Sequence, residues 1–408
     1  MKFIIYKDIY IINYEMMNII KKTPLEFNYR LSKLYNCNVY LKREDLQIVR
    51  SFKIRGAYNK ISKIKNNNKI VCASAGNHAQ GVAYICNKLN KDCDIFIPNN
   101  TPYQKINKIK YFGNDNCNII KFGNNFDSCL TKALGSINNN KTFVHPFNDY
   151  DVIEGQGEII NEIYNDIKPD IVSVCVGGGG LISGLCLNNK KNNYNIQIYG
   201  AEAETCASMK LSLKNNYNTK LYNLDNFVDG ASVAKIGDIN FNIVKNNVTE
   251  INEIVNGHIC EELINFYNYE GIILEPAGVL SVCNLKYIPD LYGKTVVCIL
   301  SGGNNDLTRY SEIVEKYLIY KELRHYFIVE FNQNPGELRT FIKNIVGKND
   351  DIIRFEYIKK SNKQVDSALI GIEVKIPSNI KIFTNNLNKY NLNYEEINNN
   401  KLLYSLLV

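Results

Sequence analysis

An apolar run that leads directly into four consecutive glycines constrains the fold more than any other part of the chain. The run is Ile171 to Val176, and it is followed by Gly177 to Gly180 and by Leu181, where we expect a helix to begin. A strand that is buried on both faces reads as a continuous apolar segment, because neither face meets water. The pattern therefore predicts a central strand that ends in a turn without side chains.

Further short β-rich runs alternate with longer stretches of helical character. The runs lie at residues 39–41, 70–72, 95–97, 119–121, 196–199 and 295–300. Such alternation is typical of α/β proteins, in which parallel sheets are flanked by helices. With 408 residues, the chain is long enough for two or three domains and for a sizeable core.

The character of the sequence changes near Tyr320, where we expect a second domain. Strands are predicted at residues 326–331, 354–358, 368–374 and 402–408, and helices at 335–338 onward and 380–390. The resulting order, β-α-β-β-α-β, is that of a ferredoxin-like domain. We accordingly expect a first region at residues 1–320 and a second domain at 325–408.

Composition argues against several classes of function. The net charge of +7 comes from 48 basic and 41 acidic residues spread along the chain, without the stripe of Lys and Arg that nucleic acid or an anionic membrane would require. No apolar run is long enough to cross a bilayer. The twelve cysteines form no Cys-x-x-Cys pair and the four histidines lie far apart, so a reducing cytoplasm fits better than a disulfide framework or a zinc site.

Lys53 is the candidate nucleophile. It lies between Phe52 and Ile54, and such an apolar setting would lower the pKa of its amine, so that the neutral form can attack a carbonyl carbon. The glycine turn could bind a phosphate through its backbone N–H groups. A mononucleotide loop would need Gly-Lys-Ser/Thr at its end and a dinucleotide turn prefers spaced glycines, and neither pattern is complete. A phosphate-bearing aldehyde cofactor fits both features.

Two further segments follow predicted strands. Ser74, Ala75, Gly76, Asn77 and His78 come after a strand at 69–73 and before a helix, so their N–H groups could hold a carboxylate. In the alternative interpretation, Asn77 only caps the helix and His78 is an ordinary surface residue. Ser301 similarly follows an apolar strand, and its alternative role is that of a strand-end hydroxyl in a glycine-rich turn.

These segments together resemble threonine dehydratase (threonine ammonia-lyase), a pyridoxal-phosphate enzyme of fold type II, the tryptophan synthase beta-like fold. The motifs stand in the family's order, and the resemblance covers residues 20 to 408. They are Ser-Phe-Lys-Ile-Arg-Gly-Ala at 51–57, Ser-Ala-Gly-Asn-His-Ala-Gln-Gly at 74–81, Gly-Gly-Gly-Gly-Leu at 177–181 and Ser-Gly-Gly-Asn at 301–304, with further agreement at 23–25, 42–45, 229–231 and 275–278. The resemblance implies a two-lobed catalytic region, with a smaller lobe at roughly 54–150 inserted in the larger, and one C-terminal ACT-like regulatory domain.

The resemblance also implies a role for each segment. Lys53 would hold pyridoxal 5'-phosphate as a Schiff base and remove the substrate's α-proton, Gly177 to Gly180 with Leu181 would bind its phosphate, and Phe52 would pack beside its ring. Asn77 would contact the ring oxygen and Ser301 the pyridine nitrogen. Weaker candidates are Gly230, where the backbone would approach the cofactor ring, and Glu275 to Pro276 on the substrate side.

The implied reaction is the deamination of L-threonine, and more weakly of L-serine, to 2-oxobutanoate and ammonia in isoleucine synthesis. Isoleucine or valine would regulate it, and a homotetramer or dimer is implied. A serine-preferring dehydratase, a β-replacement enzyme and a catalytically silent amino-acid sensor are the alternatives. Ala75 replaces the second serine of serine racemases, which disfavours racemisation. Glu202 and Ser208 align with a cation site of some relatives, but we assign no metal.

Overall fold

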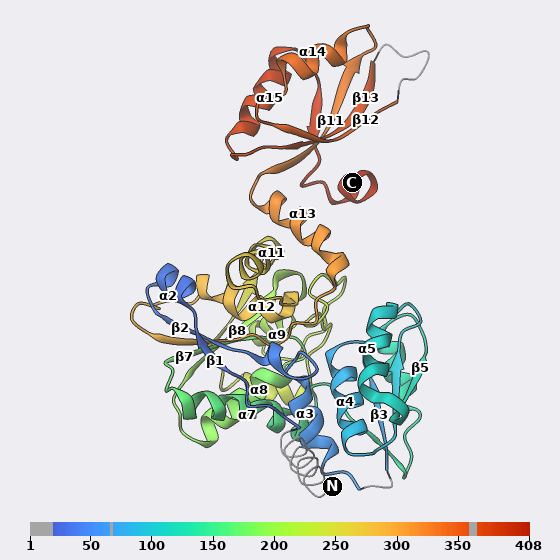
Figure 1. The fold of residues 1–408 in the computed structure, drawn as a ribbon, viewed down its shortest axis with the longest axis vertical. Coiled ribbons are helices and arrows are strands. Elements are labelled where there is room, and N and C mark those ends of the chain that lie inside the picture. Colours follow the sequence, from blue (N-terminus) through green and yellow to red (C-terminus); the bar gives the residue numbers. More distant parts are fainter. Residues whose placement is uncertain (1–18, 66–67, 359–364) are drawn as a thin grey trace, which may run out of the picture. The chain divides into compact units, whose positions relative to one another are not determined.

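The computed structural model describes residues 19–65, 68–358 and 365–408. The chain divides between Asp306 and Leu307 into two compact units, which are described separately below. Figure 1 shows their helices and strands. None of the described helices is long and apolar enough to cross a membrane.

A six-stranded sheet with the order β1-β2-β10-β7-β8-β9 forms the centre of the first unit. All neighbouring strands are parallel except β1 and β2. The strands are β1 Leu25–Phe27, β2 Asn38–Lys42, β7 Ile171–Cys175, β8 Gln197–Ala203, β9 Glu250–Ile254 and β10 Thr295–Ile299. Every residue of β7 is buried and β7 lies inside the sheet, which confirms the predicted central strand.

A second, four-stranded parallel sheet with the order β5-β4-β3-β6 interrupts the first, because its strands lie between β2 and β7 in the sequence. The strands are β3 Lys69–Ala73, β4 Cys93–Ile97, β5 Cys117–Lys121 and β6 Lys141–Phe143. Buried Ile, Val, Ala and Cys side chains fill its core. This sheet and its helices appear in blue to teal in Figure 1.

The helices of the first unit connect these strands. They are α2 Tyr29–Tyr35, α3 Lys53–Ile61, α4 Asn77–Lys88, α5 Tyr103–Gly113, α6 Phe126–Leu134, α7 Tyr150–Asp166, α8 Gly180–Lys191, α9 Ser208–Asn215, α10 Asp238–Val244, α11 Asn256–Asn265 and α12 Pro276–Cys283. The helix expected from Leu181 is therefore present and begins one residue earlier. Within the first unit, the strands that the sequence did not predict are β1 and β6, with three residues each, and the partly exposed edge strand β9.

The second unit is a four-stranded antiparallel sheet with the order β12-β13-β11-β14, which confirms the ferredoxin-like arrangement. Its elements are α13 Tyr310–Tyr320, β11 Arg324–Asn332, α14 Glu337–Asn344, β12 Asp351–Tyr357, β13 Val365–Glu373, α15 Asn379–Lys389, β14 Tyr394–Glu396 and α16 Lys401–Leu407. Phe327, Phe341 and Phe383 are buried at the centre of its core.

The prediction of a last strand at Leu402 to Val408 is wrong, because these residues form α16 and the fourth strand is β14. The Asn400 side chain caps α16 by accepting a hydrogen bond from the N–H of Leu403. Leu403, Tyr404 and Leu407 then pack on one apolar cluster with helical spacing. Leu residues favour helix once such a cap is present.

The boundary between the two units lies after Asp306, earlier in the sequence than the domain boundary predicted near residue 320. The reason is that helix α13 belongs to the second unit. Its Glu315 pairs with Arg324 on β11. The hydroxyl of Tyr326 donates to Glu315 at 2.8 Å and that of Tyr404 at 3.1 Å. One carboxylate thereby holds α13 against β11 and α16.

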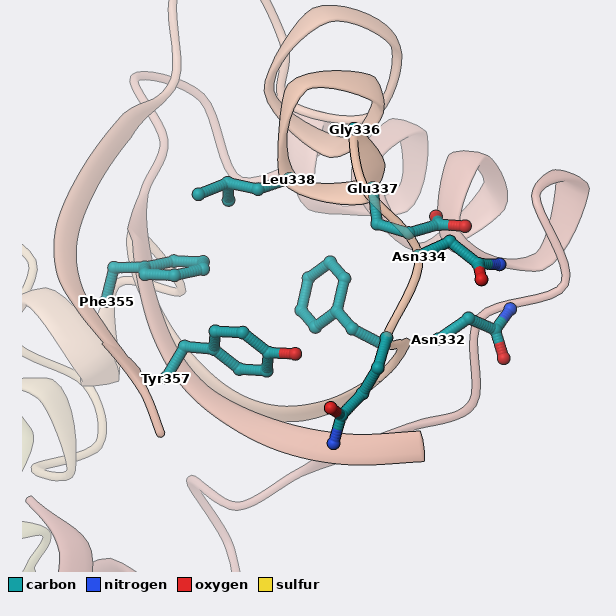
Figure 2. A pocket seen from close by; sticks show the side chains of 9 residues that line it. Asn332, Asn334, Gly336, Glu337, Leu338, Phe355 and Tyr357 are labelled. Carbon is teal, nitrogen blue, oxygen red and sulfur yellow. The ribbon is translucent and has the colours of Figure 1, made fainter. Parts of the chain in front are cut away.

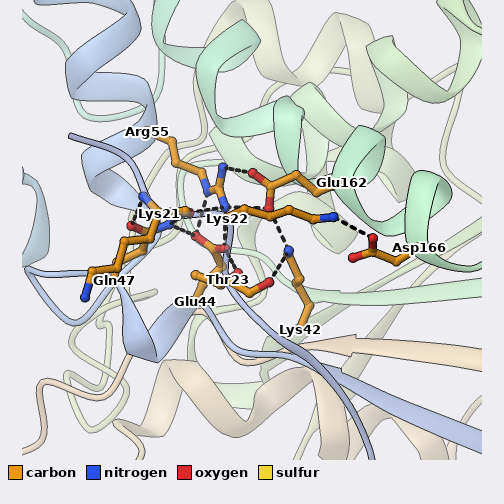
Figure 3. A network of polar contacts seen from close by, with 9 residues as sticks. All are labelled: Lys21, Lys22, Thr23, Lys42, Glu44, Gln47, Arg55, Glu162 and Asp166. Carbon is orange, nitrogen blue, oxygen red and sulfur yellow. Dashed lines mark hydrogen bonds and ion pairs between the residues drawn. The ribbon is translucent and has the colours of Figure 1, made fainter. Parts of the chain in front are cut away.

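A buried ion network fixes the start of α3 (Figure 3). The guanidinium of Arg55 binds both oxygens of Glu44 at 2.8 Å and reaches Glu162 of α7 at 2.7 Å. Lys42 of β2, which is fully buried, binds Glu162 at 2.6 Å, and Thr23 donates to Glu44 at 2.5 Å. Two cations and two anions therefore neutralise one another where β2, α3 and α7 meet.

Candidate active site

Lys53 is the first residue of α3 and follows the bridge that joins Ser51 to Gly302. Its amine donates to the carbonyl of Pro146 at 3.0 Å. Burial lowers the pKa of Lys53 to about 8, although Cys175 and Glu275 act in the opposite direction. The setting predicted for this lysine is thus confirmed, and a useful fraction of its amine is neutral near physiological pH. Phe52 lies beside it, with the ammonium 5.1 Å from the ring centre.

The glycine turn connects β7 to α8, and it is shaped so that side chains cannot enter. Gly179 has φ of +89°, a conformation that favours glycine. A Cβ on Gly178 would lie 2.3 Å from Cδ1 of Phe147. The first N–H groups of α8 have no partner within the helix, and no described side chain caps it. The turn is therefore suited to bind an anion such as a phosphate.

Asn77 is the first residue of α4, but its side chain does not cap the helix. Its amide nitrogen donates to Glu275 at 2.7 Å, and its amide oxygen accepts from Asn304 at 2.8 Å. The capping interpretation of Asn77 is therefore wrong. Since an amide carries two N–H hydrogens, one remains for a further acceptor such as a ring oxygen.

Glu275 immediately precedes α12 and is 7% exposed. Burial raises the pKa of its carboxyl to about 7, and the charge of Asp229 adds to this, while the bond from Asn77 opposes it. A Cβ on Gly302 would lie 2.3 Å from the carboxylate, so the Ser301 to Asn304 turn passes directly over Glu275. Sequence motifs marked Glu275 and Asn304 but did not show that both bind Asn77.

Ser301 follows β10 and is buried at the same edge of the sheet as the glycine turn, because β10 and β7 are parallel neighbours. Its hydroxyl donates to the carbonyl of Ala277 at 3.3 Å and accepts from the thiol of Cys175 at 3.2 Å. Ligands of α/β sheets bind at this edge, beyond the carboxyl ends of the strands. Lys53 joins this edge through the hydrogen bond between the Phe52 N–H and the Ser301 carbonyl.

His78 is not the surface residue of the alternative interpretation, because it is only 2% exposed. Its Nε2 lies 2.9 Å from the carbonyl of Val144, and burial together with the charge of Lys53 lowers its pKa to about 3. The ring is therefore neutral and donates to that carbonyl. Residues 74–77 are half-buried, and this segment leads directly into α4, which begins at Asn77.

Of the two residues considered for a cation, Glu202 has other contacts, whereas the buried hydroxyl of Ser208 has no partner among the described residues. Both oxygens of Glu202 accept backbone N–H groups at the start of α9, from Met209 and Lys210, each at 2.8 Å. Burial raises the pKa of Glu202 to about 8. Across residues 19–65, 68–358 and 365–408 there is no cluster of three or more His, Cys, Asp or Glu side chains that could hold a metal.

An amine of lowered pKa, an uncapped helix start and a buried hydroxyl at one sheet edge are groups that a pyridoxal-phosphate enzyme could use, and comparison with known proteins gives that class. Residues 16–302 match the family model of pyridoxal-phosphate dependent enzymes. Residues 315–407 match the C-terminal regulatory domain of threonine dehydratase. The chain is 46% identical over 404 residues to the biosynthetic L-threonine dehydratase IlvA of Staphylococcus epidermidis, and 45% identical to that of Staphylococcus aureus, with 96% of each chain covered.

The chain therefore belongs to the threonine dehydratase family of pyridoxal-phosphate-dependent enzymes. Among solved structures, threonine deaminase isoform 2 from Solanum lycopersicum has a TM-score of 0.69 and 34% identity, over 74% of this chain and 89% of that one. The fold type II catalytic region and the C-terminal regulatory domain expected from the sequence are both confirmed.

Proposed function

We propose that this protein deaminates L-threonine to 2-oxobutanoate and ammonia by α,β-elimination of water, and acts more weakly on L-serine. The observation that carries the proposal is the amine of Lys53, whose pKa is lowered at the sheet edge that also holds the glycine turn and Ser301. The biosynthetic relatives support the reaction as the first step of isoleucine synthesis.

Pyridoxal 5'-phosphate, when bound, supplies an aldehyde for amines and a ring that withdraws electrons from the substrate's α-carbon. Lys53 would hold the cofactor and, once its amine is released, accept the α-proton at Nζ. Gly177 to Leu181 would bind the phosphate, and Asn77 the ring oxygen. The N–H groups of residues 74–78 would orient the substrate carboxylate. Ser301 would contact the pyridine nitrogen of the cofactor through a neutral hydroxyl. A carboxylate at this position would strengthen the electron withdrawal by the ring. The weaker withdrawal expected with a hydroxyl favours prompt loss of the substrate's β-hydroxyl.

An assay of the purified protein with cofactor tests this proposal. We expect 2-oxobutanoate from L-threonine at a rate higher than that of pyruvate from L-serine. A faster reaction with serine would favour the serine-preferring dehydratase, and product that appears only with an added nucleophile would favour β-replacement. If cofactor binds and neither amino acid is consumed, the alternative of a silent sensor gains support and the proposed activity fails.

The lowered pKa of Lys53 makes cofactor capture depend on pH. Below a pKa of about 8, the neutral amine increases about tenfold per pH unit, and above it the increase stops. We expect the rate at which cofactor-free protein captures pyridoxal 5'-phosphate to follow this curve in stopped-flow absorbance measurements. A rate that still rises steeply beyond pH 9 would mean that the amine is exposed to water and has an ordinary pKa.

Replacing Gly178 by alanine tests the glycine turn. The new Cβ would lie 2.3 Å from the ring of Phe147, so the turn has to shift. Overpacking of this kind costs about 1–3 kcal/mol, and we expect cofactor to bind roughly 5- to 150-fold more weakly in equilibrium dialysis. The matched control is Gly135→Ala at the end of α6, where the nearest atom would lie at 3.4 Å. Equal affinities for both variants would contradict the phosphate role.

We further propose that isoleucine or valine regulates the enzyme through a cavity of about 130 Å³ in the second unit (Figure 2). Leu338, Phe355 and Tyr357 present apolar surface to it, and Figure 2 shows Glu337 and Asn334 at its other side. An aliphatic side chain would contact the aromatic rings, and an ammonium group would bind Glu337. The volume has room for roughly four water molecules, which suits a branched aliphatic side chain.

Titration with isoleucine and valine tests the regulatory proposal on the whole chain. We expect either amino acid to change the rate in the wild type and to lose its effect in Leu338→Glu, which places a carboxylate in the cavity. Leu402→Glu on α16 is the control, since Leu402 is 68% exposed and does not line the cavity. An unchanged rate at saturating isoleucine and valine would remove the proposal, because coupling requires differential binding between two states.

We also propose that the enzyme works in the cytoplasm as a homotetramer or homodimer. All twelve cysteines are free thiols, which supports a reducing compartment. Light scattering on the purified protein measures the assembly, and a monomeric mass would contradict it.

A further inference from the structure

A second cavity, of about 360 Å³, lies between helix α5 and two loops of the six-stranded sheet. Arg50 and Asn304 line it from the loops, and Lys108, Tyr111 and Phe112 line it from α5, together with Gln104 and Asn107. It has room for on the order of ten water molecules, so a small organic molecule fits. None of the roles described above uses this space.

The cavity carries two cations that have no carboxylate partner among the described residues. The guanidinium of Arg50 makes no hydrogen bond or ion pair with the part of the chain that the structure describes, and the ammonium of Lys108 binds the amide oxygen of Asn304 at 3.2 Å. The carboxyl groups of Glu275 and Asp306 attract Lys108 electrostatically but form no hydrogen bond or ion pair with it. Buried or half-buried cations are normally paired, so an anion between these two would satisfy both.

The backbone of Arg50 is held in an unfavourable conformation. Arg50 has φ of +59°, in the left-handed region that non-glycine residues rarely adopt. Its carbonyl accepts from the N–H of Gly303 at 2.9 Å. A Cβ on Gly303 would lie 2.8 Å from Nη2 of Arg50, so the guanidinium crosses directly over that glycine. These contacts with Gly303 hold Arg50 in a conformation that it would otherwise rarely adopt.

A chain of hydrogen bonds connects this cavity to the candidate active site. Lys108 donates to Asn304 at 3.2 Å, Asn304 donates to Asn77 at 2.8 Å, and Asn77 donates to Glu275 at 2.7 Å. Lys108 and Asn77 lie on helices α5 and α4, which flank the four-stranded sheet, whereas Asn304 and Glu275 lie in the loops that follow β10 and precede α12. A ligand that draws Lys108 away from Asn304 would therefore change the hydrogen bonds of Asn304. Through Asn304 it would affect Asn77, whose amide is proposed to contact the cofactor.

We propose that this cavity is a second binding site for a small carboxylate with a short apolar chain, occupied by the amino-acid substrate or by its 2-oxo acid product on the way to or from the active site. Arg50 and Lys108 bind the carboxylate, and Tyr111 and Phe112 contact the apolar chain. The identity of this carboxylate rests on the proposed function, whereas the site itself rests on the cavity and its two cations.

Arg50→Gln and Lys108→Gln in the cofactor-loaded, full-length protein test the site. Calorimetry gives the affinity for 2-oxobutanoate, and steady-state kinetics give the inhibition constant of 2-oxobutanoate and the KM and kcat for L-threonine. Loss of a charge-assisted hydrogen bond costs about 1.5–3 kcal/mol, so we expect roughly 10- to 150-fold weaker binding in Arg50→Gln, with recovery in Arg50→Lys. Lys110→Gln is the control, because Lys110 lies on the same helix, is exposed and does not line the cavity.

The outcomes separate the possible occupants. A weaker inhibition constant for 2-oxobutanoate with unchanged threonine KM assigns the site to the product, and a raised KM with unchanged kcat assigns it to the substrate. The proposal is overturned if Arg50→Gln and Lys108→Gln match Lys110→Gln in all of these measurements, or if sulfate binds as tightly as 2-oxobutanoate. If the wild type forms no 2-oxobutanoate but binding still depends on Arg50, the site stands and the proposed activity fails.

Discussion

Lys53→Ala is expected to lower the rate of 2-oxobutanoate formation by at least about 10³-fold, because in the proposed mechanism one amine both holds the cofactor and accepts the α-proton. Its replacement removes the neutral base of lowered pKa from the edge of the sheet. The measurement is the steady-state rate with L-threonine at saturating cofactor. A small added amine such as methylamine should restore part of the activity, since it can take the place of the lost base.

The control for this variant is Lys63→Ala, which removes an exposed ammonium just beyond α3. We expect it to keep the wild-type rate. If Lys53→Ala instead retained more than about a tenth of the activity, the assignment of Lys53 would be wrong, because general base catalysis alone contributes at least about 100-fold.

Arg55→Met is expected to have the largest effect on stability. It removes the cation that binds both oxygens of Glu44 and both oxygens of Glu162. Among the described residues, Glu44 is then left without a cation, and Glu162 keeps only Lys42. Breaking a buried ion pair in this way lowers the free energy of unfolding by about 3–5 kcal/mol. Urea unfolding followed by circular dichroism measures the loss.

The comparison variant is Lys63→Met, whose exposed pairs with Asp151 and Glu154 should contribute no more than about 1 kcal/mol. The double variant Arg55→Met with Glu44→Leu should regain part of the loss, since no unpaired carboxylate then remains at position 44. Equal destabilisation by Arg55→Met and Lys63→Met would show that the network contributes little to the fold.

The strands and the candidate site were predictable for related physical reasons. Strands such as β7 and β10 are buried on both faces, so they appear in the sequence as unbroken apolar runs. The glycine turn and Ser301 follow these strands directly, and the carboxyl ends of parallel neighbours meet at one edge. A residue that follows a predicted parallel strand can therefore be placed at the ligand-binding edge without knowledge of the tertiary contacts.

Contacts between distant parts of the sequence could not be predicted in this way. The bond from Asn77 to Glu275 joins residues 198 positions apart, and no local pattern marks Asn304 or Lys108 as its neighbours. The buried ring of His78 likewise donates to the carbonyl of Val144, which lies 66 positions away in the sequence. Tertiary packing, rather than helix or strand propensity, decides such contacts.

Mass spectrometry of the cofactor-loaded protein after reduction with borohydride tests the central claim most directly, because reduction makes the bond between an amine and the cofactor aldehyde permanent. Digestion should yield the cofactor mass on the peptide that contains Lys53, and the modification should disappear in Lys53→Ala. Cofactor attached to another lysine, such as Lys108, with Lys53 unmodified, would contradict the account.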